Sequence, residues 1–197
     1  MDCFVMPAHT RETRAEFLKY SRQITLDPNT ANTQLLLSEE NRKVTFLKQE
    51  QLYSDHPDRF IEYCQVLSRE SLTGRCYWEV ERRGRGRVSV TVAYKNIRRT
   101  GSWNDCGFGG NDKSWSLYCY PDSYTFFYNK TTTPISGPES SRVGVYLDHS
   151  AGILSFYSVS ETMTLLHRVQ TTFTQPLHAG LRIYGSEEAS AELCKLK

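Results

Sequence analysis

The sequence contains no long hydrophobic run, and none of its apolar stretches approaches the roughly 20 residues that a membrane-spanning helix needs. Residues 1–7 also lack the basic region and the long apolar region of a secretory signal. These two absences argue against a membrane protein and against a secreted one. We therefore expect a cytoplasmic protein with no membrane segment.

Cysteine is present, but not in the spacing of a metal site. None of the six cysteines belongs to a C-x-x-C pair, which argues against a zinc centre. The even number of cysteines and the sequon at residues 129–131 would suit a secreted protein with disulfides. The missing secretory signal favours the other interpretation, in which residues such as Cys76 and Cys119 are reduced thiols that act as small hydrophobic groups.

Charge of one sign is not in large excess, since the formal net charge is +2. Such a balance does not predict a nucleic-acid or membrane partner. Residues 82–87 hold four arginines and two glycines. They fit either an RNA- or phosphate-binding patch or a solvated hairpin tip, and Glu79 and Glu81 just upstream favour the tip. We expect no nucleic-acid binding here; the alternative predicts an affinity that falls steeply with salt.

No arrangement of residues points to catalysis. The glycine-rich segment 107–114 lacks the P-loop spacing and precedes a strand pattern in place of a helix. Asp148, His149 and Ser150 are consecutive, whereas a catalytic triad draws its members from distant segments. The histidines and carboxylates show no metal-ligand spacing. The sequence thus predicts a protein that is not an enzyme, with no cofactor and no metal.

What the sequence does contain is a strongly alternating strand pattern, clearest around Trp78. Cys76, Trp78 and Val80 share one face of the expected strand, which we predict is packed in the core. Tyr77, Glu79 and Glu81 share the other face, which this pattern predicts is exposed to water. Trp78 is the largest apolar group in the segment and is interpreted as the anchor between two sheets.

The rest of the chain repeats short strand patterns separated by turn residues. A capping pattern at residues 13–16 predicts a short helix over 13–21 that docks Phe17 and Leu18 on the domain. Residues 24–30 are expected to form a strand that runs into a turn, 35–47 a hairpin, 51–59 an exposed loop, and 133–138 a turn. Further strands are predicted at 65–67, 88–92, 115–119, 143–147, 154–156, 165–169 and 181–183. This spacing indicates an all-β antiparallel sandwich. In the strand at 165–169, alternation predicts that Leu165, His167 and Val169 share the inward face.

Aromatic residues are plentiful and give the best functional clue in the composition. Tyr118 and Tyr120 fall on the non-core phase of their strand. Large aromatics at exposed positions suit a protein-binding surface, because they supply contact area at little entropic cost. The alternative, that these two rings pack beneath neighbouring loops, is equally compatible with the pattern. Residues 126–128 are expected to pack beneath neighbouring loops or to form the second face of the sandwich, and not to be part of the binding surface.

Seven segments together resemble the PRY-SPRY domain family. They occur in the family's order and are 26–28 (LDP), 66–70 (VLSRE), 74–80 (GRCYWEV), 114–117 (SWSL), 142–148 (RVGVYLD), 151–157 (AGILSFY) and 173–177 (FTQPL). The resemblance implies a bent, two-sheet, antiparallel β-sandwich with a short N-terminal helix. It divides the chain into a flexible tail at 1–12, a helix and PRY segment at 13–75, and a SPRY segment at 76–197.

The same resemblance implies a non-catalytic module that recognises a protein ligand through loops at one end of the sandwich. The sequences of these motifs are similar to those of fish members of the family. This similarity predicts the substrate-binding domain of a tripartite-motif E3 ubiquitin ligase in innate immunity. The parent protein would then carry its ligase activity in a RING domain, and a coiled coil would make it a dimer, whereas the isolated domain is expected to be a monomer. The alternative is a domain of a stonustoxin-type pore-forming toxin or of an NLR-like immune receptor.

The candidate partner-binding residues follow from the family's loop positions. Since Tyr118 and Tyr120 are the positions at which the family presents aromatics, we expect their replacement by Ala to abolish partner capture and to leave the melting temperature nearly unchanged. The full candidate set is Tyr53, Asp55, His56, Arg59, Arg98, Trp103, Tyr118, Tyr120, Tyr124, Tyr184 and Glu187.

Overall fold

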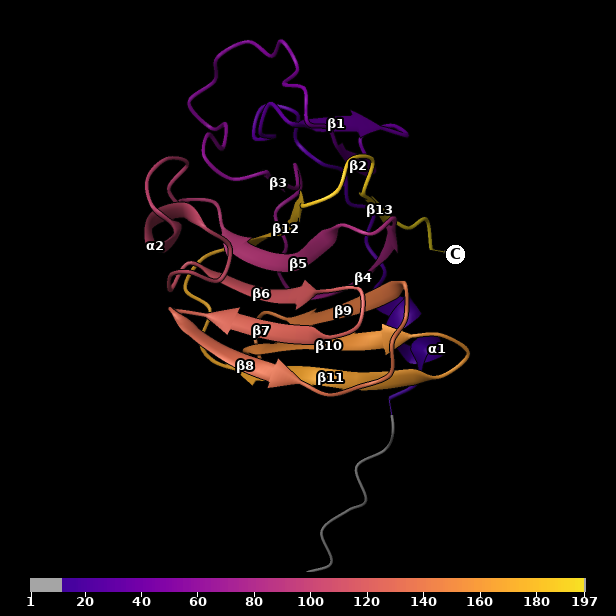
Figure 1. The fold of residues 1–197 in the computed structure, drawn as a ribbon. Helices are drawn as coiled ribbons and strands as arrows, with labels where there is room; N and C mark the ends of the chain where they lie inside the picture. Colours follow the sequence, from indigo (N-terminus) through magenta and orange to yellow (C-terminus); the bar gives the residue numbers. More distant parts are fainter. Residues whose placement is uncertain (1–11, 197) are drawn as a thin grey trace, which may run out of the picture.

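The computed structural model describes residues 12–196 and consists mainly of two antiparallel sheets (Figure 1). The tail expected at 1–12 lies outside the described residues, apart from Glu12. The seven-stranded sheet has the order β1-β2-β13-β4-β9-β10-β11. Its strands are β1 (Leu35–Ser38), β2 (Lys43–Phe46), β13 (Ser190–Leu193), β4 (Arg75–Arg83), β9 (Arg142–Asp148), β10 (Ile153–Val159) and β11 (Met163–Gln170).

The six-stranded sheet has the order β3-β12-β5-β6-β7-β8 and packs against the first. Its strands are β3 (Gln65–Leu67), β12 (Leu177–Tyr184), β5 (Arg87–Tyr94), β6 (Ser114–Cys119), β7 (Tyr124–Tyr128) and β8 (Thr131–Ile135). The N-terminal and C-terminal parts of the chain are interleaved, because β2 pairs with β13 and β3 pairs with β12. The predicted all-β sandwich is confirmed.

The core lies between the sheets and is built from the alternating positions that the sequence indicates. Cys76, Trp78 and Val80 of β4 point inward and are at most 2% exposed. They meet the inward residues of β5 and β6, among them Val90 and Leu117, in one continuous apolar cluster. Because successive side chains of a strand alternate between faces, burying these residues fixes the register of both sheets.

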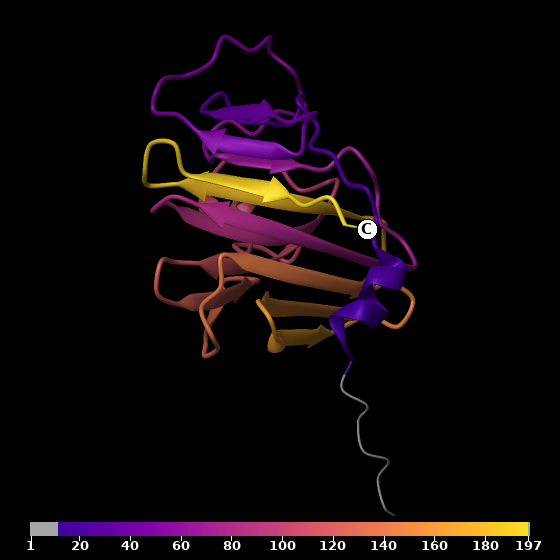
Figure 2. The ribbon, with the colours of Figure 1, turned by 90° about the vertical axis from the view of Figure 1, so that its right-hand side faces the viewer.

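The outer face of β4 is not exposed to water as its pattern predicts. A one-turn helix, α1 (Arg14–Phe17), followed by a 3-10 turn, η1 (Leu18–Tyr20), lies across it (Figure 2). The Thr13 side chain accepts a hydrogen bond from the Glu16 backbone N–H and caps the helix. Phe17 stacks on Tyr77 at 5.4 Å between ring centroids. The expected helix is therefore confirmed, and its docking is the reason that Tyr77 and Glu79 are buried.

Glu79 is fully buried beneath α1 and is held by three donors. The Arg14 Nε lies 2.7 Å from one carboxylate oxygen, the Arg142 Nη1 lies 3.0 Å from the other, and the Tyr77 hydroxyl donates at 2.6 Å. A buried carboxylate is tolerated when it is paired and hydrogen-bonded in this way. The ion pair thus ties the N-terminal helix to the seven-stranded sheet.

Three further local predictions are wrong. Residues 24–30 form no strand; Leu26 makes a single β-bridge to Ser68, and a turn begins at Pro28, which has no N–H to continue a ladder. Residues 131–135, expected in part as a turn, form the edge strand β8, where Pro134 is tolerated because an edge needs fewer donors. The exposed face of β11 also differs, because a register shift opposite Phe156 and Tyr157 makes Leu166 the buried residue and leaves Leu165 exposed.

Candidate functional site

A one-turn helix beside β5 and β6 carries Trp103 onto the outer face of the six-stranded sheet. This helix, α2 (Trp103–Cys106), lies at one side of the sandwich (Figure 1). The Asp105 carboxylate accepts hydrogen bonds from the Ser102 backbone N–H at 2.9 Å and from its hydroxyl at 3.0 Å. The Ser102 backbone contact is the main reason that the pKa of Asp105 lies below its ordinary value. Asp105 thereby stabilises the first turn of α2.

Cross-strand register brings the other residues of the site beside Trp103. Arg182 of β12 lies opposite Ser89 of β5, and Ser89 lies opposite Tyr118 of β6. The small Ser89 side chain leaves space for Arg182 to reach across the sheet, and the Arg182 Nη1 lies 3.3 Å from the Tyr118 hydroxyl. One step along the strands, Tyr184 pairs with Arg87.

These contacts form one continuous surface, which we call the aromatic–arginine patch. It consists of Tyr63, Arg87, Trp103, Tyr120, Arg182 and Tyr184. The Arg182 guanidinium carbon lies 4.0 Å from the Tyr184 ring centroid, 4.5 Å from Trp103 and 5.4 Å from Tyr63. The Arg87 carbon lies 5.3 Å from the Tyr120 ring and 5.7 Å from Tyr184. All six side chains are at least partly exposed, so the patch is a surface and not part of the core.

Tyr118 supports the patch from below and does not form part of its surface. Only 2% of Tyr118 is exposed. Its hydroxyl donates to the Phe108 carbonyl at 2.9 Å, and its ring meets Phe127 edge to face at 4.1 Å. Burial raises the pKa of Tyr118 above its ordinary value. Replacement of Tyr118 by Ala would therefore disturb packing, contrary to the nearly unchanged melting temperature expected from the sequence.

Several other candidate residues lie away from the patch. Tyr124 faces the core and donates to the Pro138 carbonyl at 3.1 Å. Arg59 is buried and donates to the carbonyls of Pro28, Ala31 and Ser54, and its guanidinium lies over Tyr53. These three side chains hold the fold together.

The remaining candidates are on exposed loops. The Glu187 carboxylate accepts from the Lys48 backbone N–H at 2.7 Å, which joins the loop after β12 to the end of β2. Arg98 lies 3.5 Å from Asp105. Asp55 and His56 stand on the irregular loop 51–59, where the His56 ring accepts from the Asp58 N–H. Their place in a binding site stays a prediction.

The candidate set predicted from the sequence includes Trp103, Tyr120 and Tyr184 of this patch and omits Tyr63, Arg87 and Arg182. Tyr63 lies two residues before the short strand β3, a position at which no periodic pattern marks its direction. Arg87 belongs to the charge run 82–87, whose pattern favours a solvated tip over an RNA- or phosphate-binding patch. The pairing of β12 with β3 on one side and with β5 on the other, which no local pattern predicts, brings Tyr63 and Arg87 beside Arg182.

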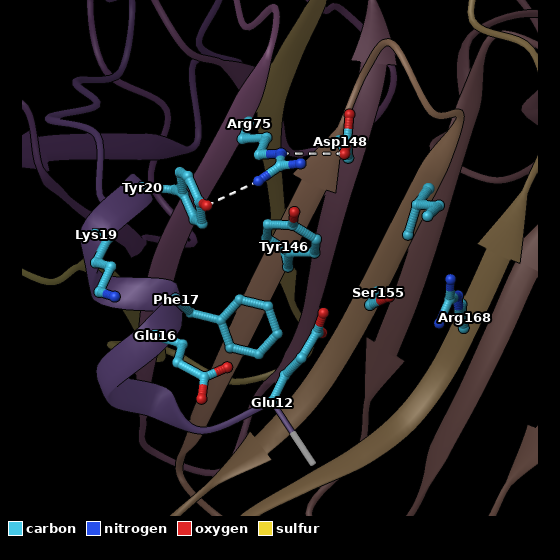
Figure 3. Close-up of a pocket in the computed structure, with 11 residues that line it drawn as sticks. Glu12, Glu16, Phe17, Lys19, Tyr20, Arg75, Tyr146, Asp148, Ser155 and Arg168 are labelled. Carbon is cyan, nitrogen blue, oxygen red and sulfur yellow. Dashed lines mark hydrogen bonds and ion pairs between the residues drawn. The ribbon is translucent and has the colours of Figure 1, made fainter. Parts of the chain in front are cut away.

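A second concave region lies between α1 and the outer face of the seven-stranded sheet (Figure 3). Its volume is about 380 Å³. Arg75 crosses it, with Nη1 2.8 Å from the Tyr20 hydroxyl and Nε 3.3 Å from the Asp148 carboxylate. Charges of both signs line the hollow, so no single charge or apolar surface distinguishes a ligand class; the acidic residues are Glu12, Glu16 and Asp148, and the basic ones are Lys19, Arg75 and Arg168. The aromatic–arginine patch is the better candidate.

Neither surface shows the geometry of a reaction centre. Within residues 12–196, no group of three or more His, Cys, Asp or Glu side chains is arranged to hold a metal ion. The five cysteines in this range are free thiols, and burial raises the pKa of Cys106 to about 11 and of Cys119 to about 12. In the same range, no helix is long and apolar enough to cross a bilayer.

Two family models match the chain, the SPRY-associated domain PRY at residues 24–72 and the SPRY domain at residues 75–194. The chain belongs to the SPRY family. Both parts of this PRY-SPRY domain share the one sandwich described above, and the matched residues include every member of the patch. A PRY-SPRY domain is a protein-interaction module and not a catalytic fold.

Similar proteins fall into two groups. The chain is 40% identical to tripartite motif-containing protein 16 of Mus musculus over 90% of its own length, and 36% identical to stonustoxin subunit beta of Synanceia horrida over 89%. It spans only 32% and 25% of these relatives. Among solved structures, the TRIM65 PSpry domain covers 99% of this PRY-SPRY chain with a TM-score of 0.82 and 27% identity, and stonustoxin covers 92% with a TM-score of 0.85 and 32% identity.

Proposed function

We propose that this PRY-SPRY domain binds a protein ligand through the aromatic–arginine patch, as the substrate-binding domain of a tripartite-motif E3 ubiquitin ligase. The observation that carries the proposal is the grouping of four partly exposed aromatic rings around Arg182 and Arg87 on one face. Tyr, Trp and Arg are the residue types that dominate binding energy at protein interfaces. Ubiquitin transfer would belong to another domain of the parent protein.

The rigidity of the patch supports the same conclusion. Trp103 is fixed by the capped turn of α2, and it meets the Tyr63 ring edge to face at 5.0 Å. Tyr184 and Arg182 project from a strand that is paired on both sides. Because these side chains are already ordered, they would lose little conformational entropy when a partner binds. The parent protein would then act in the cytoplasm as part of innate immunity.

A second candidate function is a domain of a stonustoxin-type pore-forming toxin or of an immune receptor. The similarity to stonustoxin subunit beta, at 36% identity, favours it almost as strongly as the tripartite-motif relatives favour the first. The coding sequence upstream of Met1 distinguishes the two. A RING with zinc-spaced cysteines and a coiled coil would support the ligase, whereas a pore-forming segment would support the toxin.

Alanine substitution at the patch tests the binding surface. We expect the double variant Trp103→Ala/Tyr120→Ala to lose partner capture by tenfold or more, because hot-spot truncation costs about 2 kcal/mol or more. Capture is measured by affinity purification and quantitative mass spectrometry against the wild-type domain. Leu52→Ala is the matched control, since Leu52 is fully exposed on the loop 51–59.

Two outcomes decide this test. Equal capture by the wild type, the double variant and the control would remove the patch as the binding surface. Loss of capture in the double variant supports the proposal only if its melting temperature stays within a few degrees of the wild type, so thermal unfolding is recorded for all three proteins.

A further inference from the structure

The unusual residue of the patch is Arg182, because its charge is unmatched. Seven arginines within residues 12–196 are buried or half-buried, and six of them have a carboxylate or backbone carbonyl partner. Among the described residues Arg182 has neither, and the Tyr118 hydroxyl is its one hydrogen-bond partner. Its Nε–H is buried without an acceptor, as are those of Arg42, Arg59 and Arg82. The seven are Arg14, Arg42, Arg59, Arg82, Arg99, Arg142 and Arg182.

Arg87 adds a second unmatched cation beside the same ring. Tyr184 contacts both guanidinium groups, at 4.0 Å for Arg182 and 5.7 Å for Arg87. In the described part of the chain, no carboxylate lies within 4 Å of either arginine, since all seven ion pairs involve other residues. Two cations therefore contact the Tyr184 ring, and within the described residues neither has a carboxylate partner.

The loops near the patch contain carboxylates, but within the described residues none pairs with Arg182 or Arg87. Asp105 accepts from Ser102 and pairs with Arg98. Glu187 accepts from the Lys48 backbone N–H. Glu62, Asp122 and Glu188, which are close in sequence to patch residues, form no ion pair with either arginine in this part of the chain. The two cations are therefore free to pair with an anionic group of another molecule.

The aromatic rings limit the shape of that partner. The Arg182 guanidinium lies over the rings of Tyr63, Trp103 and Tyr184, and its Nη1 contacts the Tyr118 hydroxyl. A guanidinium donates hydrogen bonds in its own plane, and a carboxylate is the acceptor that matches this geometry. Trp103 and Tyr120 provide apolar contact area in the same patch, which suits flanking hydrophobic residues of a peptide. When a partner covers the patch and excludes water, a charged hydrogen bond becomes stronger than it is in open water.

We propose that the patch recognises an acidic side chain of its protein ligand, held by Arg182 and Arg87 and flanked by apolar residues. This inference rests on the proposed function of the patch as the binding surface. The chemistry required is an anionic oxygen pair, which an aspartate or glutamate supplies directly. A phosphorylated serine or threonine supplies the same chemistry and forms a separate arm of the test.

A peptide selection provides the probe. A random twelve-residue library displayed on phage is selected against the wild-type domain, and the enriched peptides are synthesised and titrated by fluorescence polarisation. We expect Asp or Glu to be enriched at one position. Replacing that residue by Asn or Gln should weaken binding tenfold or more, since a charge-assisted hydrogen bond is lost. Phosphoserine at that position should retain binding.

Variants of the domain test whether Arg182 and Arg87 recognise the acidic side chain. Arg182→Gln should weaken the binding of an acidic peptide tenfold or more and leave the binding of the same peptide with Gln at that position unchanged. Arg87→Gln should have a smaller effect in the same direction because Arg87 is more exposed. Arg83→Gln is the matched control, an exposed arginine of the same hairpin with no aromatic contact recorded within the described chain, and should stay within twofold.

Each result has a defined meaning. Peptides that lose binding to Trp103→Ala yet lack acidic residues and bind Arg182→Gln normally would overturn this inference and keep the proposed function. A selection without any peptide sensitive to Trp103→Ala would count against the proposed function and, with it, against the inference. Unfolding curves of Arg182→Gln show whether a loss of binding comes from an altered fold.

Discussion

At the scale of single residues, neighbouring positions on one strand have opposite tasks. Tyr118 and Tyr120 share a strand face and lie 6.4 Å apart between ring centroids. Tyr118 is covered by Trp103, Phe127 and Arg182, whereas Tyr120 remains partly exposed beside Arg87. The same residue type thus serves packing at one position and a surface at the other.

This difference predicts unequal effects on stability. Tyr118→Ala should lower the free energy of unfolding by about 3–5 kcal/mol, because it removes a buried ring. Tyr118→Phe keeps the ring but removes the hydrogen bond to the Phe108 carbonyl and the one from Arg182, and should cost about 1–3 kcal/mol. Tyr120→Ala, the surface control, should cost less than either. Urea denaturation of the three variants measures these values, and equal losses for Tyr118→Ala and Tyr120→Ala would contradict the assigned burial.

Glu79 is the residue that makes stability depend on pH. Desolvation raises the pKa of its carboxyl, but hydrogen bonds from Arg14 and Tyr77, together with Arg142, outweigh that effect and bring the pKa below 4.5. A carboxyl with a depressed pKa in the folded state stabilises the fold above its unfolded pKa, and this contribution is lost as the pH falls through the folded pKa.

The variant Glu79→Gln tests this linkage. At pH 7 it should unfold with a free energy lower by roughly 1–3 kcal/mol, because half-exposed Arg14 loses its counter-charge whereas Arg142 keeps Glu81. Its stability should also decline less steeply than that of the wild type at acid pH. Urea titrations between about pH 3 and pH 7 supply both curves. Glu16→Gln changes an exposed carboxyl as the control, and parallel curves for Glu79→Gln and the wild type would refute the role of Glu79.

At the scale of elements, strand alternation is readable from the sequence, but interruptions of it are not. The alternating residues of β4, β5, β6, β9 and β10 point as the pattern predicts. In β11 the expected inward residues begin with Leu165, yet the register shift opposite Phe156 buries Leu166. A bulge depends on the partner strand, so the sequence of β11 alone does not reveal it.

The bulge predicts a clear contrast between two adjacent leucines. Leu166→Ala should lower the free energy of unfolding by about 2–4 kcal/mol, since it leaves a cavity in the core. Leu165→Ala should change it by less than about 1 kcal/mol, because Leu165 is 48% exposed. Thermal and urea unfolding of the pair measure the difference. A larger effect at Leu165 would mean that the strand pairs without the bulge.

The arrangement of α1 gives a second example at this scale. Its capping signal and its apolar residue Phe17 are visible in the sequence, and both are confirmed. Its docking place is not visible, because Tyr77, Tyr146 and Tyr157 come from three strands that meet only in the folded sheet. The sequence pattern therefore predicts that the outer face of β4 is exposed to solvent, although α1 covers it in the fold.

At the scale of the whole molecule, the two matched family segments form one folding unit. The PRY part supplies β1, β2 and β3, and these strands pair with β13 and β12 near the end of the chain. Without β2, strand β13 would keep its pairing with β4 but become an edge strand. The division into PRY and SPRY is therefore a division of sequence and not of structure.

We expect a single cooperative unfolding transition that Trp fluorescence and far-UV circular dichroism report at the same urea concentration. A variant lacking residues 12–74 should show no cooperative transition, because it loses three strands, the α1 cover and the Glu79 ion pair with Arg14. The intact chain under identical conditions is the control. A cooperative transition in the shortened chain would show that residues 75–196 fold independently.

The sequence by itself determined the sandwich, its inward-facing residues and the family, because side-chain alternation and the ordered motifs are local properties of the chain. Only the tertiary structure decided that Glu79 is buried, that Tyr118 is a support, and that Tyr63, Arg87 and Arg182 join Trp103 on one surface. The physical reason is that burial and charge pairing depend on residues far apart in sequence. Within the described residues Arg182 has no carboxylate partner, because the residues that the fold brings beside it are aromatic. No local sequence pattern predicts that arrangement.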